Sequence, residues 1–197
     1  MHIQPINSNI NFQKRLVGKA KIPNGKKQQT VNIYHLDNEK DEEIFEKAMS
    51  SKKWIGAYYL PDLNVLFGCD FKVNSYYVMT DKKGSLLCAS VVDESNKKNN
   101  ELAFIETAPT LSKYNSPARK MKFIGETMLA FIAKKGRQEK KGLYVPNVAD
   151  REKTKEFYFS QCGFIPSGKE GAKISLGAID SLIRKNEAHT GGKIEIL

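Results

Sequence analysis

The clearest functional signal in the sequence is a basic loop that runs into the start of a helix. Residues 118–129 contain Arg119, Lys120 and Lys122 ahead of an amphipathic helix whose first turn carries Gly125. The first N–H groups of a helix lack partners within it, and the positive end of the helix dipole attracts anions. Glycine admits a ligand close to the backbone, and the cations add charge-assisted hydrogen bonds. This pattern predicts a site that binds a phosphate or diphosphate without a metal ion.

Further segments flank this helix in the sequence. Residues 102–107 are predicted to form a strand that stops before Pro109, because proline cannot donate a hydrogen bond to a strand ladder. Residues 156–164 read Glu-Phe-Tyr-Phe-Ser-Gln-Cys-Gly-Phe and predict an aromatic helix that ends at Gly163. With a strand at residues 142–148, the order is strand, basic helix start, strand, aromatic helix, strand.

Two parts of the chain together resemble the acetyl-CoA-binding half of GNAT-type N-acetyltransferases. They are the strand end with the basic helix start at residues 118–129, and the aromatic helix at residues 156–164. In that family the phosphate turn follows the pattern Gln/Arg-x-x-Gly-x-Gly/Ala. Here Lys120 stands at the first position, Phe123 at that of the middle glycine, and Gly125 matches the last small residue. Thr107-Ala-Pro109 resembles the end of the preceding strand, although the loop at 110–117 is longer than the common form.

The aromatic helix is similar to the family motif Tyr-x-x-x-Gly-Phe, which packs beside the cofactor. Gly163 and Phe164 match the end of this motif. Phe159 stands at the position of the family's tyrosine, and Tyr158 stands one place earlier. The motif therefore matches with a shift of one residue at its aromatic end.

The resemblance implies that the protein transfers the acetyl group of acetyl-CoA directly to a primary amine. Glu106 is the implied general base, with Asp93 and Glu94 as alternatives, and Tyr158 is the implied proton donor to the leaving thiolate. A backbone N–H near Thr107 is the implied oxyanion donor. The implied cofactor contacts are Thr107, Lys120, Lys122, Phe123, Ile124, Gly125, Glu126, Thr127 and Phe159.

Each of these side chains also has a purely structural interpretation. Glu106 is equally consistent with a solvent-facing glutamate on a half-buried strand, and Tyr158 with an aromatic residue of the core. Cys162 is predicted to be a small buried hydrophobe, since no histidine lies near it in the sequence to activate it. A group of aromatic residues either fills the core or lines an acceptor pocket: Trp54, Tyr58, Tyr59 and Phe67.

The remaining sequence predicts an α+β fold. Alternating strands at 29–36, 75–80, 85–92 and 102–107 predict an antiparallel meander, and a helix is expected after Asp37 or Asn38. Later elements are a helix at 120–135, strands at 142–148, 163–167 and 172–178, helices at 150–162 and 180–185, and an extended piece at 193–197. The expected result is an α/β/α-layered GNAT-like fold. It has a mixed, mostly antiparallel sheet of six to seven strands with helices on both faces.

Charge is distributed unevenly along the chain, whose net charge is +10. No acidic residue precedes Asp37, and residues 113–141 hold nine Lys or Arg against Glu126 and Glu139. Residues 1–28 lack a helical or strand period, so we expect a polar basic extension ahead of a GNAT-like domain at 29–197. The main competing function is a basic nucleic-acid- or ribosome-binding module, although no known nucleic-acid motif is present. A family member that binds CoA without catalysis is a third alternative.

Composition argues against several classes of protein and of site. Three cysteines without close spacing argue against a disulfide framework, and three histidines without ligand spacing argue against a zinc site. No apolar run approaches the length of a membrane span, and the first 16 residues do not resemble a secretory signal. We therefore expect a cytoplasmic protein, monomeric or homodimeric, whose acceptor is an amine-bearing small molecule or protein.

Overall fold

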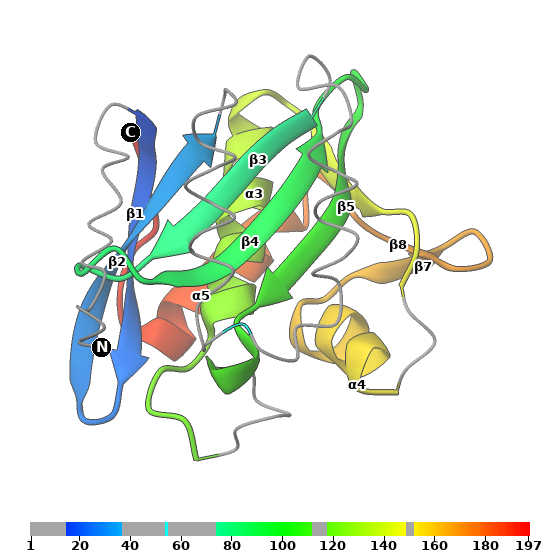
Figure 1. Cartoon of the computed structure of the whole chain (residues 1–197). Helices are drawn as coiled ribbons and strands as arrows, with labels where there is room; N and C mark the ends of the chain where they lie inside the picture. Colours follow the sequence, from blue (N-terminus) through cyan, green and yellow to red (C-terminus); the bar gives the residue numbers. More distant parts are fainter. Residues whose placement is uncertain (1–14, 37–53, 55–73, 112–117, 149–151) are drawn as a thin grey trace, which may run out of the picture.

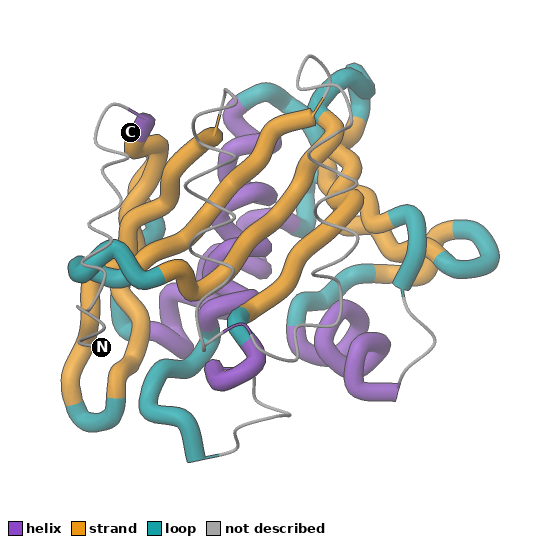
Figure 2. The backbone as a smooth tube through the Cα atoms, in the orientation of Figure 1, coloured by secondary structure: helices purple, strands orange, loops and turns teal. Residues whose placement is uncertain are grey.

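A mixed sheet of nine strands is the framework of the protein (Figure 1, Figure 2). The computed structural model describes residues 15–36, 54, 74–111, 118–148 and 152–197. The strand order is β7-β8-β6-β5-β4-β3-β2-β1-β9. The strands are β1 (Leu16–Asn24), β2 (Lys27–Leu36), β3 (Asn74–Thr80), β4 (Leu86–Asp93), β5 (Asn99–Thr107), β6 (Gly142–Val145), β7 (Ile165–Ser167), β8 (Gly171–Ile174) and β9 (Glu195–Ile196).

All strand pairs but one are antiparallel. β2 to β5 form the expected meander, and β5 pairs with β6 in parallel. A parallel pair needs a crossover, and helix α3 (Ile124–Gln138) supplies it. The predicted α+β class and mixed, mostly antiparallel sheet are therefore confirmed.

The described helices lie on one face of the sheet, where α3 and α5 (Ile179–Thr190) run behind the strands in Figure 1. A third helical segment consists of one α-helical turn, α4 (Glu152–Lys155), and a π-helix, η4 (Glu156–Gln161). Residues of α3, α5 and η4 share one core with the inward residues of the strands. The helix expected after Asp37 lies outside the described residues.

The core explains why both faces of the central strands are apolar. Met128 and Phe131 of α3 are fully buried against the sheet, and Tyr77 of β3 packs edge-on against Phe131 with ring centroids 5.7 Å apart. On the other face a second set of side chains is buried: Tyr34, Leu36, Tyr76, Val78, Ala89, Val91 and Phe104. Burial on both sides gives the continuous apolar run of β4 in place of a polar–apolar alternation.

Two expectations need correction. Residues 16–24 form β1, which pairs along its whole length with β2, so this part of the expected extension belongs to the sheet. With β1 and the two-residue β9, the sheet has nine strands instead of six to seven. The alternation in β1 is hidden because its outward positions carry lysines and its inward ones small or apolar residues, with Gly18 among them. Residues 1–14 lie outside the described residues.

The C-terminal helix is longer than the predicted 180–185. The sequence predicts too early an end because two inward positions beyond residue 185 are polar. Asn186 and Thr190 are buried beside Leu182 and Ile183, which continues the inward stripe beyond residue 185. The helix ends at Gly191, whose φ of 67° is the left-handed conformation typical of a helix C-terminus. None of the helices in the described ranges combines the length and apolar character needed to cross a bilayer.

Candidate active site

Strands β5 and β6 diverge after a short paired stretch. Their pairing covers only Asn99–Gly142, Asn100–Leu143 and Glu101–Tyr144, whereas β5 continues to Thr107. β6 instead keeps its antiparallel partner β8 as far as Val145. In Figure 1, β5 runs away from β7 and β8. The part of β5 beyond Glu101 therefore has strand pairing to β4 alone within the described chain. We use the word gap for this divergence of β5 from β6, where no described strand pairs with β5.

The backbone pattern of β5 shows which groups face this gap. Ala108 N–H donates to Leu87 O on β4 over 2.9 Å. Successive residues of a strand direct their N–H and C=O groups to opposite edges, so those of Thr107 point away from β4 and toward the gap. The same alternation directs the backbone groups of Ile105 there, opposite Ser90 in the register.

The start of α3 lies against the end of β5. A Cβ atom added to Gly125 would lie 3.1 Å from Thr107 Oγ1 and 3.9 Å from Phe157 Cζ. A contact of 3.1 Å is tighter than most Cβ atoms make, so only glycine fits here without displacing Thr107. The turn, the open end of β5 and the π-helix thus meet at one place, as the motif order predicted.

The backbone of this turn has the conformation that a glycine would favour, although no glycine stands there. Phe123 precedes the first residue of α3 with φ 60° and ψ 20°, and no side chain caps the helix. A left-handed conformation costs a non-glycine residue about 1–3 kcal/mol. Phe123 therefore holds a conformation that favours glycine, at that cost.

The predicted contacts within the turn are not all equally accessible. Thr127 N–H donates to Phe123 O over 2.9 Å, and its buried Oγ1 accepts from Asn186 over 3.2 Å. Thr127 is therefore engaged inside the protein, which contradicts its assignment as a cofactor contact. Glu126 is 5% exposed and turns its carboxylate to α5, so only its backbone faces the turn. Ile124 is buried as well and offers its backbone alone.

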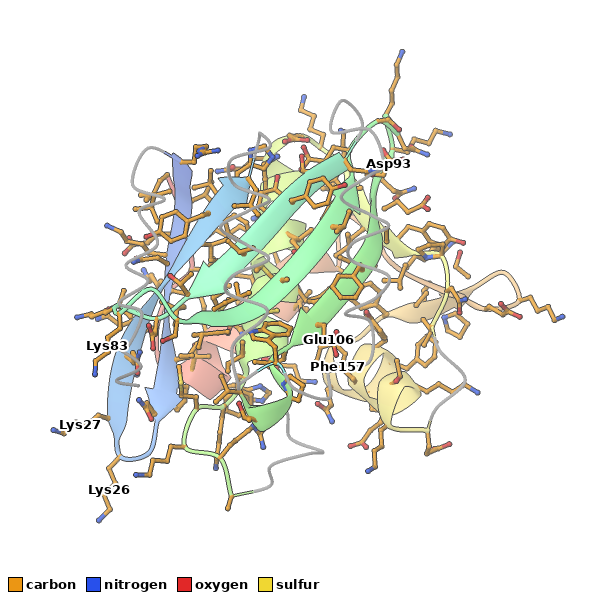
Figure 3. The ribbon with its side chains drawn as sticks, viewed as in Figure 1. Lys26, Lys27, Lys83, Asp93, Glu106 and Phe157 are labelled. Atoms are coloured by element: carbon orange, nitrogen blue, oxygen red, sulfur yellow. The ribbon has the colours of Figure 1, made fainter. Side chains whose placement is uncertain are left out.

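The hairpin of β1 and β2 supports the loop before the turn. Gly25 N–H donates to Lys120 O over 3.0 Å, and Lys122 N–H donates to Pro23 O over 3.2 Å. An isolated bridge pairs Asn24 with Met121. The hairpin tip, where Lys26 and Lys27 project into solvent in Figure 3, thereby lies next to the basic loop. Two clusters of positive charge that are far apart in the sequence become neighbours.

Glu106 lies near the end of β5, on the face opposite Thr107. Its register partner is Ala89 of β4, a small residue, and its side chain is half-buried. Figure 3 shows Glu106 at the same end of the sheet as Phe157. Burial raises the pKa of Cys88 to about 12, and the negative charge of Glu106 adds to this effect. Glu106 thus places a half-buried carboxylate near the end of β5.

The alternative carboxylates lie at the other end of the sheet. Asp93 ends β4 and appears at the far end from Glu106 in Figure 3. Glu94 accepts hydrogen bonds from Tyr77 Oη over 2.6 Å and from Lys135 Nζ over 3.0 Å. Burial acts to raise the pKa of Glu94, but these hydrogen bonds and the charge of Lys135 outweigh it and lower the pKa. Glu94 is therefore an ionised structural carboxylate, and neither residue is placed to act as the base.

The π-helix explains the one-residue shift of the aromatic motif. Cys162 N–H donates to Phe157 O over 2.9 Å, an i→i−5 bond that adds one residue to the turn. Tyr158 stands five residues before Gly163 in the sequence. Because of the extra residue in the π-helical turn, it faces the side that a residue four places before Gly163 would face in an α-helix. Sequence motifs do not reveal such an insertion.

The aromatic side chains of η4 divide between the core and the turn. Tyr158 is 6% exposed and packs edge-on against Phe157 and Phe164, with centroids 5.2 and 5.5 Å away. Phe159 is partly buried against the main core. Phe157, which the motif did not single out, is the member that reaches Gly125. The deep position of Tyr158 favours its structural interpretation, and the register of the π-helix keeps it a candidate proton donor.

Comparison with known proteins found no matching family model and no matching curated protein. Similar solved structures include a GNAT-family acetyltransferase from Staphylococcus aureus Mu50, with 16% identity, 74% of this chain and 99% of that chain covered, and a TM-score of 0.49. A putative acyl-CoA N-acyltransferase from Klebsiella pneumoniae is 12% identical, with coverages of 74% and 97% and a TM-score of 0.46. AtaTR bound with acetyl-CoA is 16% identical, with coverages of 77% and 97% and a TM-score of 0.48.

Within the described chain, the sheet is an antiparallel meander that continues into one parallel pair, β5 and β6, bridged by α3. At these identities the likeness concerns the arrangement of strands and helices alone. The meander, the crossover helix and the divergent parallel pair stand in the order expected from the sequence. In the described part of the chain, no group of three His, Cys, Asp or Glu side chains is arranged to hold a metal ion.

Proposed function

We propose that the protein is an acetyl-CoA-dependent N-acetyltransferase that acts on a primary amine. The observation that carries this proposal is the meeting of Gly125, Thr107 and Phe157 at the gap between β5 and β6. The absence of a side chain at Gly125 lets the start of α3 pack closely against Thr107, which brings the first amides of the helix to the end of β5. The residues present therefore fit a diphosphate at the turn and an extended arm along β5.

Binding would use backbone groups more than side chains. The N–H groups of Ile124, Gly125 and Glu126 are the unpaired first amides of α3, and the helix dipole adds positive potential there. The exposed Lys120 and Lys122 supply long-range attraction for an anion. The free edge of β5 offers N–H and C=O groups to the amide-containing arm of the cofactor. Acetyl-CoA itself supplies an activated acetyl thioester.

The chemistry assigned to this chain is proton transfer and charge stabilisation. Glu106 removes a proton from the ammonium form of the acceptor, which frees its nitrogen for attack on the thioester carbonyl. The Thr107 N–H points into the gap and is the donor to the developing oxyanion, an interaction worth about 3–4 kcal/mol in comparable sites. Tyr158 is the proposed proton donor to the departing thiolate.

Cofactor binding is the first test. Acetyl-CoA should raise the melting temperature of the protein and bind in calorimetry with a micromolar Kd. Gly125→Asp should abolish this binding, because it adds a carboxylate and a clash with Thr107 at the anion site. Gly177→Asp is the matched control, since no atom lies within 4 Å of a Cβ at Gly177. Equal affinity of the two variants would reject the assignment of the turn.

Catalysis needs a test of its own, because a protein that binds acetyl-CoA without turning it over would also pass the binding test. Release of CoA should be followed with a panel of polyamines, aminoglycosides, peptide N-termini and lysine peptides. Tyr158→Phe should then lower kcat with little change in acetyl-CoA affinity. Binding without acetylation of any amine would leave a CoA-binding protein and reject the enzymatic part of the proposal.

A second candidate function is favoured by the union of the two basic clusters. Five exposed lysines surround the junction of the hairpin and the turn, and none forms an ion pair with another described residue: Lys21, Lys26, Lys27, Lys120 and Lys122. Such a surface suits a polyanion, RNA included. Under this function RNA binding should weaken steeply with salt, and Lys26→Glu/Lys27→Glu should abolish it. Unchanged RNA affinity in that variant would reject it.

A further inference from the structure

The last turn of α5 contacts the turn at the start of α3. The imidazole of His189 stacks on the ring of Phe123, with centroids 5.0 Å apart and planes 22° apart. Its Nδ1 lies 3.0 Å from Glu126 Oε1 and 3.2 Å from Oε2. Since a carboxylate only accepts hydrogen bonds, Nδ1 carries the hydrogen. One side chain of α5 therefore touches the residues on both sides of Gly125.

Phe123 needs such a contact because its conformation is unfavourable by itself. Its φ of 60° is in the left-handed region, and no capping side chain of α3 fixes it. Strained backbone persists only where the surrounding structure holds it in place. The stacking on His189 fixes the direction of the Phe123 ring, and the ring direction fixes the backbone that carries it.

Glu126 needs the contact for a different reason. A carboxylate in the first helical turn would compete with an anion for the same positive potential. Here the carboxylate also accepts from Asn186 Nδ2 over 3.0 Å, so α5 holds it away from the gap. His189 and Asn186 thus both hydrogen-bond to the carboxylate of Glu126, the acidic residue in the first turn of α3.

The end of α5 is itself fixed to the hairpin beneath the turn. Gln28 Nε2 donates to Thr190 O over 2.9 Å and to Gly191 O over 3.1 Å. The hairpin also binds the loop before the turn through Gly25 and Pro23. The hairpin, the turn and α5 therefore form a closed set of contacts, in which His189 is the link to Phe123.

We propose that His189 is a positioning residue of the cofactor turn. It keeps Phe123 in the left-handed conformation that opens the backbone of Ile124–Glu126 to an anion, and it holds the Glu126 carboxylate aside. This inference rests on the proposed function for its ligand but concerns contacts that the protein makes without one. It assigns a role in cofactor binding to the C-terminal helix, outside the segments that the sequence motifs covered.

The test is a double-mutant cycle between His189 and Phe123, read by calorimetry with CoA. His189→Ala should weaken CoA binding about tenfold, which corresponds to about 1.4 kcal/mol. In the Phe123→Gly background the same substitution should cost less than about twofold, because glycine adopts a positive φ without support. Arg184→Ala, an exposed substitution on the same helix, is the control for general effects on α5. Equal losses in the two backgrounds would overturn the proposal.

A second measurement separates this inference from the proposed function. Amide hydrogen exchange at Thr127, whose N–H donates to Phe123 O, should quicken in the ligand-free His189→Ala protein and stay slow in His189→Phe, which preserves the stacking. Failure of the wild-type protein to bind CoA would reject the proposed function while leaving this comparison intact. Unchanged exchange in His189→Ala would overturn the positioning role even if CoA binds.

Discussion

Asn186 Nδ2 donates to Glu126 Oε1 over 3.0 Å and so joins the buried faces of α5 and α3. Asn186 is fully buried, and its Oδ1 has no hydrogen-bond partner among the described residues. A buried amide whose oxygen has no hydrogen-bond partner is costly. The two hydrogen bonds from Asn186 Nδ2, to Glu126 and to Thr127, offset this cost. This pair shows how a polar interface supports the turn.

Replacement of Asn186 by leucine should therefore destabilise the protein. The variant removes one of the two side chains that donate to the nearly buried Glu126 carboxylate, and we expect a loss of about 2–3 kcal/mol in the free energy of unfolding. Urea titration followed by circular dichroism measures it. Ser181→Ala, an exposed position on the same helix, should change the midpoint little. A leucine variant as stable as the wild type would show that Glu126 does not depend on this hydrogen bond.

Glu94 should make stability fall in acid. Its pKa lies below the ordinary value of 4.5 because hydrogen bonds from Tyr77 and Lys135 to the carboxylate outweigh burial. A carboxylate whose pKa is lowered by folding stabilises the folded state. This stabilisation is complete above the ordinary pKa and is lost as the pH falls through the lowered pKa. Glu94→Gln should cost about 1–2 kcal/mol at pH 7, and the difference from wild type should shrink as the pH falls below the ordinary pKa of 4.5. A gap between the two proteins that is constant from pH 7 to pH 3 would contradict this.

The two described cysteines should resist alkylation in the native state. Burial raises the pKa of Cys88 to about 12, and burial followed by the charge of Glu126 raises that of Cys162 further. Both thiols therefore stay protonated and covered at pH 8. Peptide mass spectrometry after brief iodoacetamide treatment should find both unmodified, and both modified after unfolding in urea. Rapid native labelling of Cys162 would instead point to a reactive thiol beside η4.

Glu106→Gln should separate turnover from binding. If Glu106 is the base, kcat should fall by about a hundredfold or more while acetyl-CoA affinity changes little. The acidic limb of the pH–rate profile should disappear as well. Glu101→Gln, on the same strand where it still pairs with β6, is the matched control. A profile with the same limb in Glu106→Gln would assign the base elsewhere.

Much of the fold could be predicted because its strands and central helix carry regular apolar periods. The meander from β2 to β5, α3 and the order of later strands follow from such periods and from turn residues. β1 was missed because its outward lysines resemble a solvated tail. The apolar period ends too early to predict the full length of α5, because Asn186 and Thr190 are polar but occupy inward positions. Asn186 donates to Thr127 of α3, and the Thr190 hydroxyl donates to Asn186 O within α5.

The site could be predicted less completely, because part of its geometry is not local. The sequence around Gly125 predicts the start of a helix there, and α3 begins at Ile124. The role of Phe157 depends on a π-helix that no motif reveals, and the contact of His189 with Phe123 joins residues 66 positions apart. The engagement of Thr127 depends on the same distant helix. Contacts of this kind follow from the packing of α5 on α3 and are visible only in the folded chain.

The outermost strands of the sheet are very short. β7 has three residues and β9 has two, and β9 pairs only with Gly18 and Lys19 of β1. Near its other end, β1 is covered by the bridge between Asn24 and Met121. The long strand β1 is therefore protected near both ends by other parts of the same chain, which leaves little uninterrupted backbone for strand addition by another molecule. Among the described residues, this arrangement works against strand addition along β1.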